Sequence, residues 1–315
     1  MAFAIHENAL IALTAAAFWG GGDFSGGMGV KASGGRVPAA IRFVILAHAI
    51  SLVVLVSILW ARHAGLPHGA AGLWSVAGGV TGALGVVAFY IALSRGGMGI
   101  SAAVSGLLAA AIPAVVSSWM EGAPSGLRLA GFALAGGAIW MIAAGDSPES
   151  KGESRGTMAL AIFAGLAFGV YFVALRMANP LGLVMPMAIA RASSVTLCAV
   201  TLGVTALIGS GSRLQPRSED PNPSTGSGQP LGHPMAGRWP AVLGWACAVA
   251  LLDTSGNVLF MAATRLGRLD VASVLASLYP AGTILLAAWA LHERPTRRQG
   301  LGMVAALAAV VMITL

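Results

Sequence analysis

The chain alternates long apolar runs with short polar connectors from one end to the other. An α-helix needs about 20 residues to cross the hydrocarbon core of a bilayer, and most of the runs are close to that length. The pattern therefore predicts an all-α integral membrane protein with ten transmembrane helices. They are expected at residues 9–30, 38–61, 71–94, 98–120, 127–145, 157–177, 183–208, 240–263, 270–291 and 297–315.

Two connectors are longer and more polar than the others. The segment GDSPESKGESRG follows the fifth run, and residues 209–238 separate the seventh run from the eighth. The second segment is rich in Ser, Gly and Pro, a composition that cannot bury enough apolar surface to become ordered. We expect residues 209–238 to form a flexible loop without catalytic content. The N-terminal stretch lacks the basic start of a signal peptide, so we expect it to be retained as the first helix.

An internal repeat is visible when FYIALSRGGMGISAAVSGLL (89–108) is set against LFMAATRLGRLDVASVLASL (259–278), at an offset of 170 residues. Five positions that match in this register are Ala92, Arg95, Gly97, Ala102 and Val104 against Ala262, Arg265, Gly267, Ala272 and Val274. The repeat divides the chain into residues 1–148 and 149–315, each with five spans. Because five is odd, the second repeat must enter the membrane in the opposite orientation, an arrangement common in secondary transporters.

Composition supports the membrane assignment and removes one alternative. Hydrophobic residues make up 57% of the 315 residues and charged residues only 9%, with a mean hydropathy of +0.82. A soluble domain carries about 25% charged residues. The net charge of +7 comes from Lys and Arg scattered through connectors rather than gathered on one face, so no nucleic-acid partner is expected. Connector charges favour termini that face outward but leave the orientation open.

Several segments resemble the EamA-type transporters of the drug/metabolite transporter superfamily. They are FWG (18–20), RF (42–43), FYIALSRG (89–96) and the ending LASLYPAGTILLAAWALHERPTRRQGLGMVAALAAVVMI (275–312). The first repeat departs from that ending, since Pro113 lies eight residues before Glu121 whereas thirteen separate Pro280 from Glu293. The resemblance implies two EamA-like five-helix repeats and a transporter, often an exporter, of amino acids or other small metabolites.

Acidic residues inside apolar runs are the first candidates for a site, because a charge in the membrane usually faces the bundle interior or a water-filled cavity. Asp23 lies among five glycines in FWGGGDFSGG. It is expected either in a discontinuous helix that presents a carboxylate to a substrate amine or a proton, or at a helix end. Asp253 and Asn257 are one turn apart and share a helix face, which favours either a cavity lining or hydrogen bonds between helices.

Two arginines occupy similar places in the repeats, in AIR (40–42) and IAR (189–191). Arg42 and Arg191 either extend to the membrane interface or pair with Asp23, Asp253 or a substrate carboxylate. Most membrane aromatics pack or line the interface, but Tyr279 beside Pro280 is a stronger candidate, because a proline frees a backbone carbonyl. His48 is a lone histidine in an apolar helix, more often a packing residue than a proton relay.

The complete prediction for the substrate site consists of polar and aromatic residues near the middle of their spans. It comprises Trp19, Asp23, Tyr90, Ser105, Tyr171, Asp253, Asn257 and Tyr279. Asp23 and Asp253 are also the candidates for coupling transport to a proton. We expect the cavity to be lined by the first, third, fourth, sixth, eighth and ninth spans.

Enzyme motifs are absent from the sequence, which contains no HExxH, GxSxG, CxxC or GxxxxGK[ST]. We expect no catalytic residue, metal or cofactor, and any pumping would use an ion or substrate gradient. The sequence predicts a multi-pass inner-membrane transporter working by alternating access, with a small-molecule substrate and membrane lipid as partners. A non-transporting receptor or complex subunit is the main alternative, and a lipid-modifying membrane enzyme is a weaker one.

Overall fold

A computed structural model describes residues 2–65, 67, 69–95, 98–143, 155–211, 239–290 and 296–314. In this part of the chain all regular secondary structure is helical, as the apolar runs predict. The first repeat contains α1 (Ala2–Ala32), α2 (Val37–Ala61), α3 (Ala70–Arg95), α4 (Met98–Glu121) and α5 (Gly126–Ala143). The second contains α6 (Arg155–Ala178), the 3-10 helix η2 (Asn179–Leu181), α7 (Val184–Gly211), α8 (Trp239–Leu266), α9 (Leu269–Ala276), α10 (Tyr279–Ala290) and α11 (Arg297–Thr314).

These helices make ten spans, because α9 and α10 together form the ninth. In the described residues, eight spans are long and apolar enough to cross a membrane, counting Leu269–Leu286 as one, and α5 adds a shorter apolar helix. The remaining helix, α1, has 31 residues, more than the about 20 that a membrane span requires. The predicted multi-pass membrane fold is therefore confirmed. The predicted loop began too early, because residues 209–211 belong to the last turn of the helix that ends at Gly211, and residues 212–238 lie outside the described residues.

The ninth span differs from the single helix expected at 270–291, because it is interrupted at Ser277 and Leu278. Pro280 lies in the first turn of α10. Proline is accepted there, whereas in an unbroken helix its ring would clash with the carbonyl four residues earlier and a hydrogen bond would be lost. The predicted ninth span is therefore present, but it is divided into two helices.

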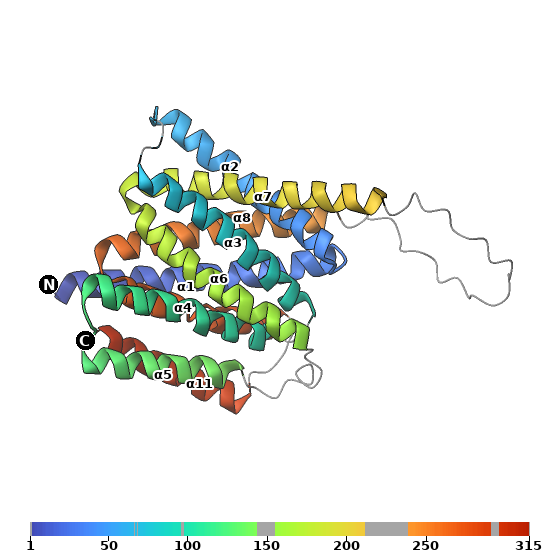
Figure 1. The fold of residues 1–315 in the computed structure, drawn as a ribbon. Coiled ribbons are helices and arrows are strands. Elements are labelled where there is room, and N and C mark those ends of the chain that lie inside the picture. Colours follow the sequence, from blue (N-terminus) through green and yellow to red (C-terminus); the bar gives the residue numbers. More distant parts are fainter. Residues whose placement is uncertain are drawn as a thin grey trace, which may run out of the picture.

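Packing follows the inverted repeat. The first helix of each repeat packs on the third helix of the other, as α1 on α8 and α6 on α3. The second helices pack together as α2 and α7, and the fifth helices as α5 and α11, a pair at the edge of the bundle (Figure 1). Figure 1 also shows α1 and α6 running in opposite directions and both termini at one end of the bundle. The predicted division at residues 148 and 149 falls outside the described residues and stays a prediction.

Two glycines allow backbones to meet where the ninth span breaks. A Cβ on Gly20 would lie 2.9 Å from the Tyr279 carbonyl oxygen and from the Cα of Gly282. A Cβ on Gly106 would lie 2.9 Å from the Ser277 carbonyl oxygen. Any side chain would separate these helices, as expected for small residues at membrane helix crossings. The close approach places the broken span directly against α1 and α4.

Candidate functional site

A cavity lies among helices of both repeats, at the level of Asp23 and Asp253. It contains about 520 Å³ of space not filled by protein atoms, part of it open to the outside. Its polar lining comprises Asp23, His48, Arg191, Ser194, Asp253 and Asn257. Its aromatic lining comprises Trp19, Phe168, Tyr171, Phe172 and Tyr279, and the remaining lining is small or aliphatic: Gly78, Gly79, Gly82, Ala83, Val86 and Ala190.

Arg191 is the centre of the polar lining, although only 4% of its surface is exposed. Its guanidinium forms an ion pair with Asp253 on α8 and donates to the Thr254 hydroxyl at 3.2 Å. A second guanidinium nitrogen donates to Nε2 of His48 on α2 at 2.9 Å. The network joins α2, α7 and α8, and so connects the two repeats within the membrane.

The hydrogen bonds of His48 fix its protonation. A guanidinium can only donate, so Nε2 of His48 must accept and carries no proton. The neutral ring then holds its proton on Nδ1, which lies 2.6 Å from the Ser194 hydroxyl. A histidine held in this way between Arg191 and Ser194 is an uncharged part of the cavity wall.

The two arginines that matched in the sequence lie in different environments. Arg42 is exposed, as expected for a side chain at the membrane interface, whereas Arg191 is buried and paired with Asp253. For Arg191 the pairing alternative therefore holds. The sequence could not distinguish the two, because the partners of Arg191 lie 62 and 143 residues away along the chain.

Asp23 lies in an unbroken α1, so the discontinuous-helix alternative is wrong at this position. A Cβ on neighbouring Gly22 would lie 3.4 Å from the backbone nitrogen of Asp253, which places the two acids side by side across the α1–α8 contact. In the part of the chain that the structure describes, Asp23 has no ion-pair partner. The cavity thus contains one paired and one unpaired carboxylate.

Asn257 lies one turn beyond Asp253, and both side chains line the cavity. Its amide nitrogen donates to the Asp253 backbone carbonyl at 2.7 Å, while its side-chain oxygen is buried without a hydrogen-bond partner. An unpaired buried acceptor is unfavourable by about 1–3 kcal/mol. A donor on a bound molecule would satisfy it.

Stacked aromatic rings form the end of the cavity nearer the N-terminal side of the membrane. The Trp19 ring lies parallel to Phe172 at 5.0 Å between centroids and meets the edge of Tyr279 at 6.5 Å. The Tyr279 hydroxyl lies 2.7 Å from that of Ser105, which orients the ring from α4. A Cβ on Gly256 would lie 2.6 Å from the Trp19 ring, so this glycine makes room for the indole.

Six of the eight predicted site residues line the cavity together: Trp19, Asp23, Tyr171, Asp253, Asn257 and Tyr279. Ser105 lies behind Tyr279, and Tyr90 is buried against Gly26 and Phe43, outside the lining. Among the described residues α4 provides no lining residue, contrary to expectation, whereas α2 and α7 do. Arg191, His48 and Ser194 were missing from the predicted site. The available signals were their polarity within apolar runs and, for Arg191, its match to Arg42.

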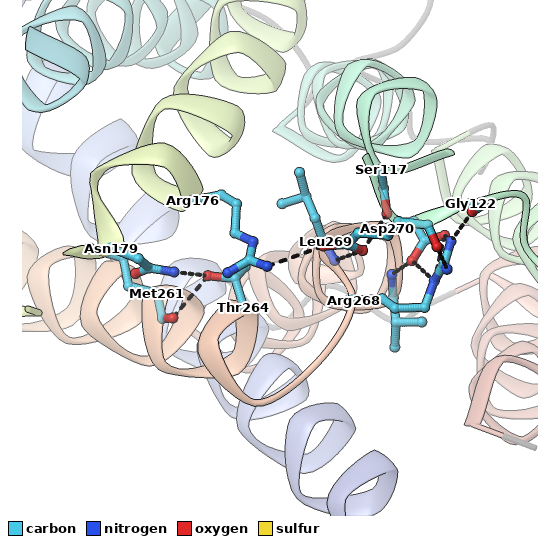
Figure 2. Close-up of polar contacts among 11 residues, drawn as sticks. Ser117, Gly122, Arg176, Asn179, Met261, Thr264, Arg268, Leu269 and Asp270 are labelled. Atoms are coloured by element: carbon cyan, nitrogen blue, oxygen red, sulfur yellow. Dashed lines mark hydrogen bonds and ion pairs between the residues drawn. The ribbon is translucent and has the colours of Figure 1, made fainter. Parts of the chain in front are cut away.

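A second polar cluster lies on the N-side, the membrane side that carries the N-terminus, where α4, α6 and α8 end and α9 begins (Figure 2). The Glu121 carboxylate accepts hydrogen bonds from the Ser117 hydroxyl at 2.8 Å, the Leu269 backbone N–H at 3.0 Å and Arg176 at 3.3 Å. Separately, Asn179 donates to Thr264 at 3.0 Å, which connects the ends of α6 and α8. These bonds hold the four helix ends together.

Arg268 completes this N-side network, as its bonds to α4 in Figure 2 show. It donates to the backbone carbonyls of Glu121 at 2.9 Å and Gly122 at 2.7 Å, satisfying groups left free at the end of a helix. It also pairs with the fully buried Asp270 at 2.7 Å. The hydrogen bond that Arg268 donates to Asp270 raises the pKa of the Arg268 guanidinium, which keeps it charged. Groups of His, Cys, Asp or Glu suited to a metal are absent from the described residues.

The architecture is that of a multi-pass membrane protein with inverted repeats around a central cavity, as in secondary transporters. The sequence profile of the EamA-like transporter family matches residues 155–315, and the chain belongs to this family.

Comparison with solved structures supports the fold independently. A structure titled "Crystal structure of protein" aligns over 98% of this chain and 98% of its own, with a TM-score of 0.67 and 17% sequence identity. At that identity the likeness shows the fold alone. A search of curated proteins found no match.

Proposed function

We propose that this protein lies in the inner membrane and is a secondary transporter that exports small metabolites such as amino acids by alternating access. The observation that carries the proposal is a cavity inside the membrane, shared by both repeats and lined by Asp23, Arg191 and Asp253. Charged side chains are expensive in hydrocarbon and are retained where they bind a solute or an ion. The two five-helix repeats would rock against each other around this fixed site.

The N-side network is suited to a conformation of this cycle in which the cavity is closed toward the N-side. Glu121 and Arg268 connect the end of α4 with the start of α9, one helix from each repeat. In alternating access, these bonds would hold the N-side closed and break when the cavity opens there. The described conformation would then be the one that is closed on the N-side.

Proton coupling through Asp23 or Asp253 is part of the proposal. Asp23, without an ion-pair partner among the described residues, is the group of the two that is free to exchange a proton, whereas Asp253 is held by Arg191. If Asp23→Asn and Asp253→Asn variants both transport normally with unchanged pH dependence, coupling through these residues is wrong.

The test is uptake and efflux of a labelled panel of amino acids and metabolites in proteoliposomes, with and without an imposed pH gradient. Flux that needs the protein and changes with the gradient would support a coupled transporter. Glu7→Gln is a matched control, because it removes an exposed carboxylate from the same helix about four turns before Asp23. Its flux should equal that of the unchanged protein.

The alternatives make different predictions in the same experiment. A receptor or complex subunit would bind a compound from the panel without moving it across the bilayer. A lipid-modifying enzyme would convert the liposome lipids into new species, which mass spectrometry of the lipid extract would detect. Either result, with a correctly folded protein, would replace the transport proposal.

A further inference from the structure

The cavity has two unlike walls, although the helices that form them are related by the internal repeat. The wall from α1, α7 and α8 carries both carboxylates, Asn257 and Arg191. The wall from α3 and α6 carries glycines, Ala83, Val86 and aromatic rings, and its polar group is the hydroxyl of Tyr171. A bound molecule would therefore meet charge on one side and apolar surface on the other.

The charges of the polar wall do not balance. Asp23 and Asp253 carry two negative charges when ionised, Arg191 carries one positive charge, and His48 is neutral because its Nε2 accepts from Arg191. An uncompensated charge is expensive in a low-dielectric interior. An ionised Asp23 therefore has no compensating charge in the cavity, and either a proton or a cation bound beside it would supply one.

We propose that the substrate is an amphipathic molecule with a protonated amine, a substrate class that rests on the transport function proposed above. The amine pairs with Asp23 and donates a second hydrogen bond to the free side-chain oxygen of Asn257. The apolar part lies against Val86, Phe168 and Tyr171 on the opposite wall. A carboxylate on the substrate is not required.

The contacts between α1 and α8 are consistent with this placement of the amine. The two helices run antiparallel, with Gly22 against Asp253 and Trp19 against Gly256. Asn257 therefore lies on the same wall as Asp23, displaced toward the N-side by about five residues, or about 7.5 Å along the helix axis. The indole of Trp19 closes the N-side end of this space.

Anionic substrates are disfavoured by the same geometry. Arg191 is already engaged by Asp253, His48 and Thr254. A substrate carboxylate that took Asp253's place would leave both acids of the cavity unpaired. The ion pair between Arg191 and Asp253 is thus a positioning element that keeps the guanidinium from attracting anions.

The test compares three compounds that share a phenyl group and a short chain but differ in charge. They are phenethylamine (cation), phenylalanine (zwitterion) and 3-phenylpropanoate (anion). Binding to the purified full chain in detergent would be measured by isothermal titration calorimetry at one pH. We expect the two amines to bind at least about tenfold more tightly than the anion, since the anion would leave Asp23 unpaired and bring a further negative charge into the cavity.

Variants give the second arm of the test. Asp23→Asn should reduce phenethylamine binding at least about tenfold and abolish the preference over 3-phenylpropanoate. Glu7→Gln should bind as the unchanged protein does, and size-exclusion chromatography would show that both variants are folded.

Equal binding of the anion, binding of none of the three compounds, or amine binding unaffected by Asp23→Asn would each overturn the inference. Amine binding that depends on Asp23 without any flux in proteoliposomes would retain the amine site and remove the transport proposal. Flux of metabolites that lack an amine, with no flux of the amines, would retain the transport proposal and remove the amine site.

Discussion

The fourth and ninth spans occupy the same place in the two repeats, yet only the ninth is broken. Helix α4 continues from Met98 to Glu121 through Pro113, whereas the ninth span stops at Ala276 and resumes at Tyr279. At the repeat offset of 170, Pro280 corresponds to Ala110, so the two prolines are not equivalent. The repeat therefore fixes where a span lies but not whether it is continuous.

The two helices on either side of the break make contacts with different parts of the bundle. The N-terminal half, α9, is held to the end of α4 through Glu121 and Arg268. The second half, α10, is held to α1, where Thr283 donates to the Gly20 carbonyl at 3.3 Å, and it supplies Tyr279 to the cavity. A movement that opens the N-side can thus bend the ninth span at Ser277 and Leu278 without displacing the cavity wall.

The largest effect is expected from filling the contact where the two spans touch. Gly106→Val would push a side chain into the Ser277 carbonyl, and overpacking of this kind destabilises by about 1–3 kcal/mol. Thermal unfolding of the purified protein should shift downward. Gly137→Val on α5 is the control, since no atom lies within 4 Å of a Cβ there. Equal shifts in the two variants would show that the contact at the break is not tight.

The next effect concerns the attachment of α9 to α4. Glu121→Gln keeps one acceptor oxygen but removes the charge of the group that accepts from Ser117, Arg176 and Leu269, so these hydrogen bonds lose their charge assistance. We expect a cysteine placed at buried Ser273 to react at least about tenfold faster with a soluble thiol reagent in this variant. Both native cysteines, Cys198 and Cys247, would first be replaced.

In that labelling experiment, Glu7→Gln again serves as the control, because Glu7 is exposed and lies outside the network. Its labelling rate should match that of the parent. If Glu121→Gln also leaves the rate unchanged, the N-side network does not hold the helices closed.

The prolines allow a direct comparison of the spans. Pro280→Ala restores a backbone N–H at the break and favours a continuous ninth helix, so we expect several-fold slower transport. Pro113→Ala should change the rate less than about twofold, since α4 is already continuous. Initial rates in proteoliposomes would measure both. A larger effect at Pro113 would indicate that the fourth span bends during transport rather than the ninth, which would contradict this account.

The smallest expected effect is on the hydrogen bond between the two spans. Ser105→Ala and Tyr279→Phe each remove the bond of 2.7 Å between their hydroxyls, worth about 1 kcal/mol. Combined in one chain, they should destabilise by less than the sum of the single changes. Strict additivity in thermal unfolding would mean that the bond contributes nothing.

Much of the fold followed from local pattern, because apolar runs must span the bilayer and an odd repeat must invert. The break at Ser277 was missed, since a proline in the first turn of a helix leaves no gap in an apolar run. Pairing of Arg191 with an aspartate was one of the predicted alternatives, but the sequence could not choose between them. Nothing near Arg191 in the sequence indicates Asp253 or His48, which meet it only through packing of three helices.

The candidate site was predictable where an unusual residue stood in an apolar run. Asp23 and Asp253 are such cases, and both line the cavity. Tyr90 was an equally strong candidate for the cavity lining. Its ring instead packs against Gly26 on α1, which leaves room for it, and only 1% of the Tyr90 surface is exposed. Which way a membrane tyrosine points depends on the glycines of a neighbouring helix. Glu293, matched to Glu121 in the sequence, lies outside the described residues.

The most direct test of transport through this cavity is counterflow of labelled phenylalanine in proteoliposomes preloaded with the unlabelled compound. The account predicts that label accumulates transiently above its equilibrium level with the unchanged protein and with Glu7→Gln, and that Asp23→Asn loses this accumulation. Label that binds the protein but never accumulates, or accumulation that persists in Asp23→Asn, would contradict it.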